Sequence, residues 1–277
     1  MSYFEFEIPA RAWSDDQREV LQAKMWQIGF EGFAEDDDII RAYIDQRRYS
    51  ARRLNRLIDE CDRLGIRVQY RYHETGEQNW NREWESKFHP VIIGGEVLVR
   101  ATFHDSRNDL PCTVVIDPKM SFGTGHHHTT RMMILEMMEL DLAGKSVLDM
   151  GCGTGILGIF AALKGAARVL GIDNDQWAYE NALENVLRNG VDMNIRLGDI
   201  QSAGEQRFDY ILANITRNVL VEHMPAYAGL LAGGGMLLVS GILAEEVQYV
   251  LNAAYQEGLK HLNTREESNW LSLSFIC

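Results

Sequence analysis

Cysteines are few in this sequence, and their spacing suits neither a disulfide framework nor a zinc site. The 277 residues contain four of them, which are far apart in the chain and form no C-x-x-C pair: Cys61, Cys112, Cys152 and Cys277. A small secreted domain held by disulfides would carry more cysteines at closer spacing. The cysteines therefore indicate reduced thiols in a cytoplasmic protein.

The sequence also lacks a signal peptide and any long hydrophobic run. It begins MSYFEFEIPARAW, where apolar residues alternate with acidic ones, whereas a secretory leader has a basic start and an apolar stretch. No apolar stretch approaches the roughly 20 residues that a membrane helix needs. We predict a cytoplasmic protein with no membrane partner.

Positive charge is scarce as well. The chain has 27 Lys and Arg residues against 40 Asp and Glu residues, which gives a formal net charge of -13. Such a chain has no overall positive field to attract nucleic acid or an anionic membrane, and it suits a basic partner. Hydrophobic residues make up 46% of the sequence, enough to bury a sizeable core in one large domain or two unequal ones.

Two amphipathic helices are predicted in the first 77 residues. The first begins at a capping box formed by Ser14 and Gln17, and the second begins at Ser50. Each helix ends at a glycine, Gly29 or Gly65. The apolar side of the first helix consists of Leu21, Met25 and Ile28, and that of the second consists of Leu54, Leu57, Ile58, Cys61 and Leu64.

Strands surround these helices. Alternation of apolar and polar residues predicts strands at 3–8, 39–45 and 66–72, with a short strand near Phe33. The resulting order, β-α-β-β-α-β, is that of a ferredoxin-like unit, in which two helices cover one face of a sheet. We predict that residues 1–77 form this small α+β domain.

The next segment is polar apart from three aromatic residues spaced by four: Trp80, Trp84 and Phe88. This spacing predicts an exposed linker helix over residues 78–90, stopped before Pro90. The aromatic seam is interpreted as a packing stripe, since burying aromatics is the ordinary way to anchor a solvated helix.

From residue 91 to residue 277 the pattern changes to alternating strands and helices. A hairpin turned at Gly94 and Gly95 and a strand at 113–117 come first. Short apolar strands between amphipathic helices then predict a parallel, doubly wound sheet covered on both faces. The last segments, KHLNTREE and WLSLSF, have no long helix between them, so we expect a closing antiparallel hairpin. The fold class is therefore α/β.

The stretch LDMGCGTGILGI, residues 148–159, places three glycines at alternate positions directly after a predicted strand. In a doubly wound sheet the ligand lies outside the carboxyl ends of the strands, at the switch point where this turn falls. Gly151, Gly153 and Gly155 lack the Cβ atoms that would block a ligand, and the following helix start is expected to supply free N–H donors. We predict that this glycine turn, residues 151–155, binds a nucleotide-like ligand.

Two ligands fit the glycine turn. Gly153, Gly155 and Gly158 satisfy G-x-G-x-x-G, and Asp173 at the end of the next strand suits the ribose of NAD. Alternatively, Asp149 and the three alternate glycines resemble the first motif of class I S-adenosylmethionine-dependent methyltransferases. In that case Asp149 would attract the ammonium group of the cofactor, and Asp173 would hold its ribose.

Asn214, which ends the predicted strand FDYILAN, is the candidate catalytic residue. In amino methyltransferases this position often begins Asn-Pro-Pro-Tyr, whereas Ile215 and Thr216 follow it here. Methyl transfer is an in-line displacement, and the side-chain oxygen of Asn214 can orient the hydrogens of the incoming amine. The alternative is that Asn214 only forms a turn; the nearby glycine turn favours the catalytic role.

The stretch SFGTGHHHTT, residues 121–130, contains three consecutive histidines. Neighbours in sequence rarely converge on one ion, and no acid or cysteine cluster at ligand spacing accompanies them, so we predict no metal site. The glycine-rich loop leads into a helix that begins near Thr129 and Thr130. We expect the loop to fold over a bound ligand.

Taken together, FGTGHHHTT, DMGCGTG, GIDNDQWA and ILANI occur in this order and closely resemble PrmA, the methyltransferase family that modifies large-subunit ribosomal protein eleven. The resemblance covers most of the chain. It implies a class I catalytic domain over residues 91–277, preceded by a linker helix and a small substrate-binding domain. The chain departs from the family at residues 126–128, where many members have Thr-His-Pro.

The resemblance also implies the chemistry. S-adenosylmethionine would be the cofactor, and lysine ε-amines and the N-terminal α-amine of a basic ribosomal protein would receive the methyl groups. The residues implied to contact the cofactor are Phe122, Thr130, Gly151, Gly153, Asp173 and Asn214. Two alternatives stay open: a small-molecule methyltransferase of the same fold, and an NAD-dependent oxidoreductase.

One basic run stands out in the acidic sequence: Arg47, Arg48, Arg52, Arg53 and Arg56. These arginines could touch ribosomal RNA. The pattern favours a different interpretation, in which they form the solvated face of the second helix, whose other face is apolar.

Overall fold

The computed structural model describes residues 3–36, 38–75, 89–105, 110–117 and 121–277. The chain divides into two compact units, Met1–Phe88 and His89–Cys277. The predicted linker helix over 78–90 falls almost entirely on residues 76–88, outside the described residues. Within the described residues, no helix is long and apolar enough to cross a membrane.

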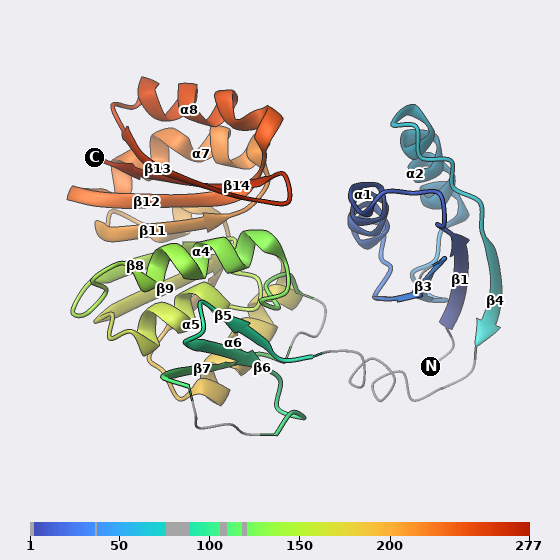
Figure 1. Ribbon diagram of the computed structural model, residues 1–277, viewed down its shortest axis with the longest axis horizontal. Coiled ribbons are helices and arrows are strands. Elements are labelled where there is room, and N and C mark those ends of the chain that lie inside the picture. The colour runs from blue at the N-terminus through green and yellow to red at the C-terminus, as the bar shows by residue number, and fades with distance from the viewer. Residues whose placement is uncertain (1–2, 37, 76–88, 106–109, 118–120) are drawn as a thin grey trace. The chain divides into compact units, whose positions relative to one another are not determined.

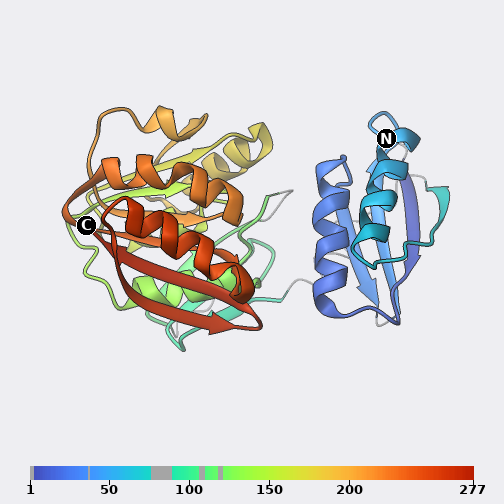
Figure 2. The ribbon, with the colours of Figure 1, turned by 90° about the horizontal axis from the view of Figure 1, so that it is seen from above.

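The first unit has the strand order of a ferredoxin-like domain, as predicted. Its four strands are arranged β2-β3-β1-β4, and each pair of neighbours is antiparallel. Both helices lie on one face of this sheet (Figures 1 and 2). In chain order the elements are β1 Tyr3–Pro9, α1 Asp15–Gln27, β2 Gly32–Asp36, β3 Ile39–Asp45, α2 Ala51–Arg63 and β4 Arg71–Thr75.

The start of α1 follows from its sequence. The backbone N–H of Gln17 donates to Oγ of Ser14, and the backbone N–H of Ser14 donates to Oε1 of Gln17. This reciprocal pair is the predicted capping box, which satisfies donors that the first turn of a helix leaves free. Leu21 and Met25 are then buried against the sheet.

The end of α2 corrects one prediction. Leu64 was expected on the apolar face, but it is 58% exposed, and Ile66 is buried instead. Gly65, at φ +76°, reverses the chain, so that Ile66 N–H donates to Cys61 C=O and Gly65 N–H to Asp62 C=O. These bonds turn Ile66, the second residue after the C-cap, toward the core, and they leave the C-cap Leu64 outside it.

The predicted strand over residues 66–72 begins later than expected. Residues 66–70 are not paired in the sheet, and β4 starts at Arg71, where it pairs with Glu7 of β1. Ile66 is buried, and Val68 and Tyr70 pack against the same core. Over residues 66–70 the alternating pattern therefore comes from an extended segment that packs on the core, not from a strand of the sheet.

The second unit begins with a small sheet of order β5-β6-β7. Its strands are β5 Val91–Ile93, β6 Val97–Arg100 and β7 Cys112–Val115. β5 and β6 form the predicted hairpin, with Gly94 at φ +60° and Gly95 at φ +74° in its turn. β7 is parallel to β6, and its other edge faces α6.

The main sheet has seven strands in the order β10-β9-β8-β11-β12-β14-β13 (Figure 1). The first five are parallel, and the last two form the predicted antiparallel hairpin. The strands are β8 Ser146–Met150, β9 Arg168–Asp173, β10 Asn194–Leu197, β11 Phe208–Asn214, β12 Leu231–Leu243, β13 Lys260–Glu267 and β14 Trp270–Ile276.

Helices cover both faces of the main sheet. One core lies under α4, α5 and α6, and the other lies under α7 and α8. Neighbouring residues of one strand, such as Val147 and Leu148, contribute to opposite cores, as a doubly wound sheet requires. The helices are α4 His128–Met138, α5 Ile156–Leu163, α6 Gln176–Asn189, α7 Arg217–Leu230 and α8 Val247–Gln256.

Candidate active site

The glycine turn lies at the carboxyl edge of three adjacent strands. Met150, the last residue of β8, pairs with Ile172 of β9 on one side and with Ala213 of β11 on the other. The next residue of each strand is therefore Gly151, Asp173 or Asn214. The register brings these three sequence-predicted residues together at the switch point of the sheet.

The backbone N–H groups of the glycine turn are all used within the protein. Gly151 and Cys152 donate to Ile172 C=O, Gly153 donates to Oδ2 of Asp173, Thr154 to Phe122 C=O and Gly155 to Cys152 C=O. Free N–H donors were expected at the helix start that follows the turn, where the N–H of Gly158 donates to Asp149; the five amides of the turn itself are also used. An anionic group placed here would meet no donor from these five amides.

The glycines serve close contacts with the protein itself. A Cβ atom at Gly151 would lie 2.3 Å from Cγ2 of Ile215, and one at Gly153 would lie 2.3 Å from the carbonyl oxygen of Phe122. Both residues also have positive φ, +68° and +55°. The missing Cβ atoms let two neighbouring segments pack onto the turn.

Residues 121–127, the site loop, cross the glycine turn directly. Phe122 C=O accepts from the N–H of Thr154 at 2.9 Å, and Gly123 C=O accepts from Oγ1 of Thr154 at 2.6 Å. Thr154 is fully buried, whereas the Phe122 side chain is 53% exposed. The Phe122 ring meets His127 edge-on, and His127 meets Trp270 of β14 in the same way. The loop is thus fixed by its backbone and presents the Phe122 ring outward.

Asp173 holds the turn in place. Its Oδ2 accepts from the N–H of Gly153 at 2.8 Å, and its Oδ1 accepts from the N–H of Asp175 at 3.0 Å. Burial raises the pKa of this carboxyl above its ordinary value. A carboxylate has about four lone-pair positions, so two bonds leave acceptor capacity for ligand hydroxyls.

Asp149 makes its hydrogen bond inside the protein. It is 1% exposed, and its Oδ2 accepts from the N–H of Gly158 at 2.9 Å, inside α5. Burial raises the pKa of Asp149 to about 7. The side chain therefore points into the protein, and it can affect a ligand only through its charge.

Asn214 carries an unsatisfied acceptor. Its Nδ2 donates to Oγ1 of Thr130, a fully buried residue of α4, at 3.3 Å. Its Oδ1 is buried and has no hydrogen-bond partner among the residues that the structure describes. A buried oxygen without a donor is costly, so a donor group of a bound ligand would find an acceptor here.

The three histidines point to three different partners. Nε2 of His126 lies 2.9 Å from His89 C=O, Nδ1 of His127 accepts from the N–H of Thr129, and Nδ1 of His128 lies 3.0 Å from Oε1 of Glu267. His127 is the N-cap of α4. Across the described residues there is no group of three or more His, Cys, Asp or Glu side chains placed to hold a metal ion.

Sequence reasoning missed Thr154 and Asn185. Asn185 is fully buried, accepts from the N–H of Asp117 and donates to Thr154 C=O. The signal was present, because asparagine recurs every four residues on α6, at Asn181, Asn185 and Asn189. Three polar residues on one face of a helix usually indicate a solvent-exposed face. They predict a buried contact only when the segment packed against that face is known.

A parallel sheet of this order, closed by an antiparallel hairpin and carrying a glycine turn at its switch point, is the fold of class I methyltransferases. The solved structure of a ribosomal protein L11 methylase from Lactobacillus delbrueckii subsp. bulgaricus shares this fold. Its TM-score is 0.64 at 24% identity, and the match covers 68% of this chain and 98% of the other.

The sequence comparisons are more specific. Residues 9–276 match the family model described as ribosomal protein L11 methyltransferase (PrmA), and the chain belongs to this family. A ribosomal protein L11 methyltransferase from Phocaeicola vulgatus is 36% identical over 100% of this chain and 99% of its own length. One from Porphyromonas gingivalis is 40% identical over 93% of this chain and 90% of its own. The family predicted from the motifs is confirmed.

Proposed function

We propose that this protein transfers methyl groups from S-adenosylmethionine to amino groups of ribosomal protein L11, namely lysine ε-amines and the N-terminal α-amine. Its family membership and the names of its relatives support the reaction class and the substrate. The observation that carries the proposal for the site is the buried, unpaired Oδ1 of Asn214, which can accept a hydrogen from an incoming amine.

The residues at the carboxyl edge suit a cationic cofactor better than a dinucleotide. The N–H groups of residues 151–155 are already bonded, so a pyrophosphate would find no donor on these five amides. Asp173 is a buried carboxyl bonded to the turn, and its field favours a positive ligand; Asp149, whose pKa is about 7, adds to this field only when it is ionised. S-adenosylmethionine carries a sulfonium, whose methyl group is open to displacement by an amine.

In this scheme, residues of the chain bind the cofactor and orient the substrate amine. Asp173 would accept from the ribose hydroxyls, Gly151 and Gly153 would form the floor beneath the cofactor, and Phe122 would cover it. Thr130 fixes the Asn214 amide through the Nδ2 bond, which leaves Oδ1 directed at the substrate amine. Orientation of the reacting atoms is the main requirement of an in-line transfer.

The amine must be neutral when it attacks. A lysine ammonium that leaves water for a partly buried edge, next to a positive sulfonium, has its pKa lowered by desolvation and by charge repulsion. The proton can then leave to solvent without a dedicated base. In this proposal the site lowers the pKa of the amine by desolvation, and Asn214 orients the amine for attack.

The substrate side of the proposal rests on charge and on the first unit. A chain of net charge -13 attracts a basic ribosomal protein at long range. Residues 1–77 are proposed to recognise that protein, joined to the catalytic unit through residues 78–90. The cytoplasmic location follows from the substrate, because ribosomal proteins are used in that compartment. Contact with ribosomal RNA would be incidental.

Two measurements test this function. Titration calorimetry should show uptake of S-adenosylmethionine and none of NAD. Incubation with methyl-labelled S-adenosylmethionine and a mixture of ribosomal proteins should place the label in ribosomal protein L11. Label only in small metabolites would favour the small-molecule methyltransferase, and uptake of NAD alone would overturn the proposal.

A further inference from the structure

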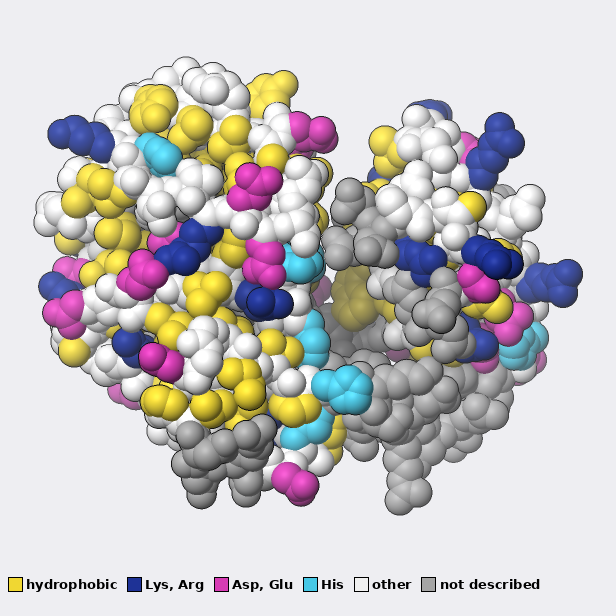
Figure 3. Space-filling view, viewed as in Figure 1, with side chains coloured by type: hydrophobic (Ala, Val, Ile, Leu, Met, Phe, Trp, Pro, Cys, Tyr) yellow, Lys and Arg dark blue, Asp and Glu magenta, His cyan; other side chains and the backbone are white. Residues whose placement is uncertain are grey.

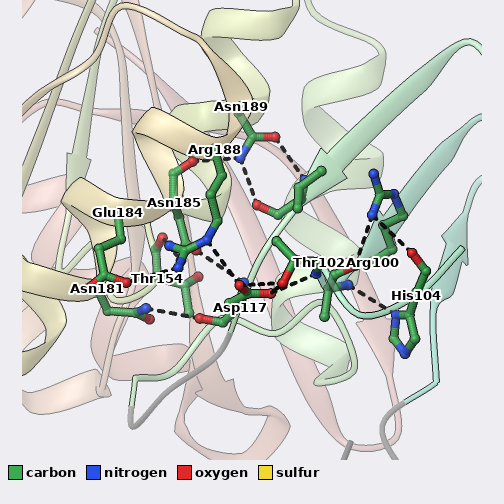
Figure 4. Close-up of polar contacts among 12 residues, drawn as sticks. Arg100, Thr102, His104, Asp117, Thr154, Asn181, Glu184, Asn185, Arg188 and Asn189 are labelled. Carbon is green, nitrogen blue, oxygen red and sulfur yellow. Dashed lines mark hydrogen bonds and ion pairs between the residues drawn. The ribbon is translucent and has the colours of Figure 1, made fainter. Parts of the chain in front are cut away.

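The edge of β7 that faces away from β6 is covered by one helix. Side-chain amides of α6 at Asn181, Asn185 and Asn189, here called the asparagine ladder, point toward it (Figure 4). Oδ1 of Asn189 accepts from Val115 N–H at 2.8 Å, and Nδ2 of Asn189 donates to Val115 C=O at 2.7 Å. One amide thus satisfies both backbone groups of a residue, as a neighbouring strand would.

The ladder continues past the end of the strand. Oδ1 of Asn185 accepts from Asp117 N–H at 3.1 Å, and Nδ2 of Asn181 donates to Asp117 C=O at 2.9 Å. The spacing explains the match. Four helical residues advance about 6 Å, and two strand residues advance about 6.6 Å. Amides four apart on α6 can therefore meet backbone groups two apart in an extended segment.

Asp117 is also fixed through its side chain. Its carboxylate accepts from the backbone N–H of Thr102 at 2.7 Å and from Oγ1 of Thr102 at 2.8 Å, and Nε of Arg188 lies 3.0 Å from Oδ2 (Figure 4). The chain at Asp117 is thus held by α6 and by the end of β6.

Asn185 differs from the other two members of the ladder because it also reaches the glycine turn. Its Nδ2 donates to Thr154 C=O at 3.0 Å, while its Oδ1 binds Asp117. Thr154 in turn makes both bonds to the site loop, at Phe122 and Gly123. One fully buried amide therefore connects the end of β7 with the turn on which the site loop rests.

We propose that Asn185 is a positioning residue for methyl transfer: it sets the distance between Asp117 and Thr154 and thereby the placement of Phe122 over the glycine turn. This inference rests on the proposed function of the site. It assigns the cofactor affinity of the enzyme partly to a side chain that does not touch the cofactor. Asn189, which has the same chemistry and makes no hydrogen bond to the glycine turn, is the matched control; its Nδ2 also donates to the backbone C=O of Asn185.

The test compares Asn185→Asp with Asn189→Asp. Ionised aspartate keeps the shape and the acceptor of asparagine but cannot donate. Asn185→Asp therefore removes the bond to Thr154 C=O, and Asn189→Asp removes the bonds to Val115 C=O and to the backbone C=O of Asn185. We expect the Kd for S-adenosylmethionine, measured by calorimetry, to rise about tenfold in Asn185→Asp and less than twofold in Asn189→Asp.

Hydrogen exchange measured by mass spectrometry gives a second readout that needs no cofactor. In Asn185→Asp the peptides covering residues 121–125 and 153–155 should exchange faster than in the wild type. In Asn189→Asp the faster exchange should be confined to residues 112–116. If Asn185→Asp does not fold, Thr154→Val, which removes the bond to Gly123, is expected to speed exchange at residues 121–125 in the same way.

The outcomes separate this inference from the proposed function. Equal exchange at the site loop in both variants, or a cofactor Kd in Asn185→Asp within twofold of the wild type, would overturn the positioning role and leave the function standing. Wild-type protein that binds no S-adenosylmethionine would overturn the proposed function, while the exchange data would still decide whether Asn185 places the site loop.

Discussion

Asp45 of the first unit and Asp149 of the second are held in opposite ways. In the first unit, Asp45 accepts from the side-chain Nε and the backbone N–H of Arg47, and these bonds lower its pKa to about 2. In the second unit, Asp149 is enclosed and accepts from a backbone N–H, and burial raises its pKa to about 7. The first arrangement favours the charge, and the second disfavours it.

This difference extends to the polar contacts around each carboxylate. Ion pairs of the first unit, such as Arg48 with Glu31, join partly exposed side chains. Around the glycine turn the polar side chains are buried and bonded to backbone groups: Thr154, Asp173 and Asn185. Backbone partners cannot move aside, so a change near the turn should cost more than a comparable change in the first unit.

The largest effect is expected for Gly153→Ala. Its Cβ would meet the carbonyl oxygen of Phe122 at 2.3 Å, in addition to the strain of positive φ. Overpacking and left-handed strain together predict a loss of roughly 2 to 5 kcal/mol in the free energy of unfolding. Gly65→Ala in the first unit has positive φ but no atom within 4 Å, so it should lose only about 1 to 2 kcal/mol. Equal losses in thermal denaturation would contradict the comparison.

The second test concerns pH. Because the pKa of Asp149 is about 7 in the folded chain and about 3.9 when unfolded, the folded state retains a proton that the unfolded chain releases between these values. Its stability therefore falls as pH rises through this window. Asp149→Asn should be more stable than the wild type at pH 8, by at most about 4 kcal/mol, and the difference should vanish near pH 4.

Asp45→Asn provides a control of opposite sign for the pH test. Its lowered pKa means that the stabilising charge is present above about pH 4 and is lost as pH falls toward 2. This variant should therefore be less stable than the wild type at pH 7 and should match it at low pH. The free energy of unfolding is measured with denaturant at each pH. If it varies with pH in the same way in Asp149→Asn and in the wild type, the pKa of Asp149 is not raised in the folded chain.

Asn214→Ala probes the function of the catalytic unit more than its fold. If Oδ1 orients the amine, turnover of labelled methyl groups should fall by about 10²-fold, with a much smaller change in the Kd for S-adenosylmethionine. Asn214→Asp keeps the oxygen acceptor and should retain more activity than the alanine variant. Unchanged turnover in Asn214→Ala would remove this residue from the mechanism.

Asp173→Ala should act mainly on cofactor binding. The ribose hydroxyls would lose a charged acceptor, which weakens the affinity for S-adenosylmethionine by roughly 1.5 to 3 kcal/mol. Part of the loss should come from the freed N–H of Gly153, since this donor is bonded to Asp173. Calorimetry with the wild type and this variant checks the prediction, and an equal Kd would place the ribose elsewhere.

The smallest effect is expected on the first unit, for the triple change of Arg52, Arg53 and Arg56 to Gln. All three are exposed, and basic side chains are spread over the visible face of this unit with acidic ones between them (Figure 3). We expect stability to change by less than about 0.5 kcal/mol and binding of ribosomal protein L11 to be unchanged. A clear loss of substrate binding in a pull-down would reassign these arginines to the interface.

Much of the fold was predictable because local patterns determine it. A capping box, terminal glycines and strand periodicity predicted most helices and strands of both units, and their order predicted the ferredoxin-like sheet and the parallel sheet closed by a hairpin. Predictions failed where the backbone conformation at one residue, or a partner distant in sequence, decides which side chain is buried. Leu64 lies on the apolar stripe of α2, yet the reversal at Gly65 places Ile66 in the core instead.

The candidate site shows the same limit. Gly151, Asp173 and Asn214 were predictable because each lies at the carboxyl end of a strand of one parallel sheet, Gly151 directly after β8 and the other two as the last residues of β9 and β11. The bonds of the glycine turn were not, because its amides are used by Ile172 and Phe122, and no sequence pattern reports such partners. The same holds for Asn185, whose two partners, Asp117 and Thr154, are 68 and 31 residues away.

The asparagine ladder has one consequence beyond the reaction. An edge strand with open backbone groups can recruit a strand from another molecule, which is a route to aggregation. At Val115 and Asp117 the outer edge next to β7 is already occupied by amides of α6. The same side chains that organise the site therefore also help to keep this small sheet from joining a second chain.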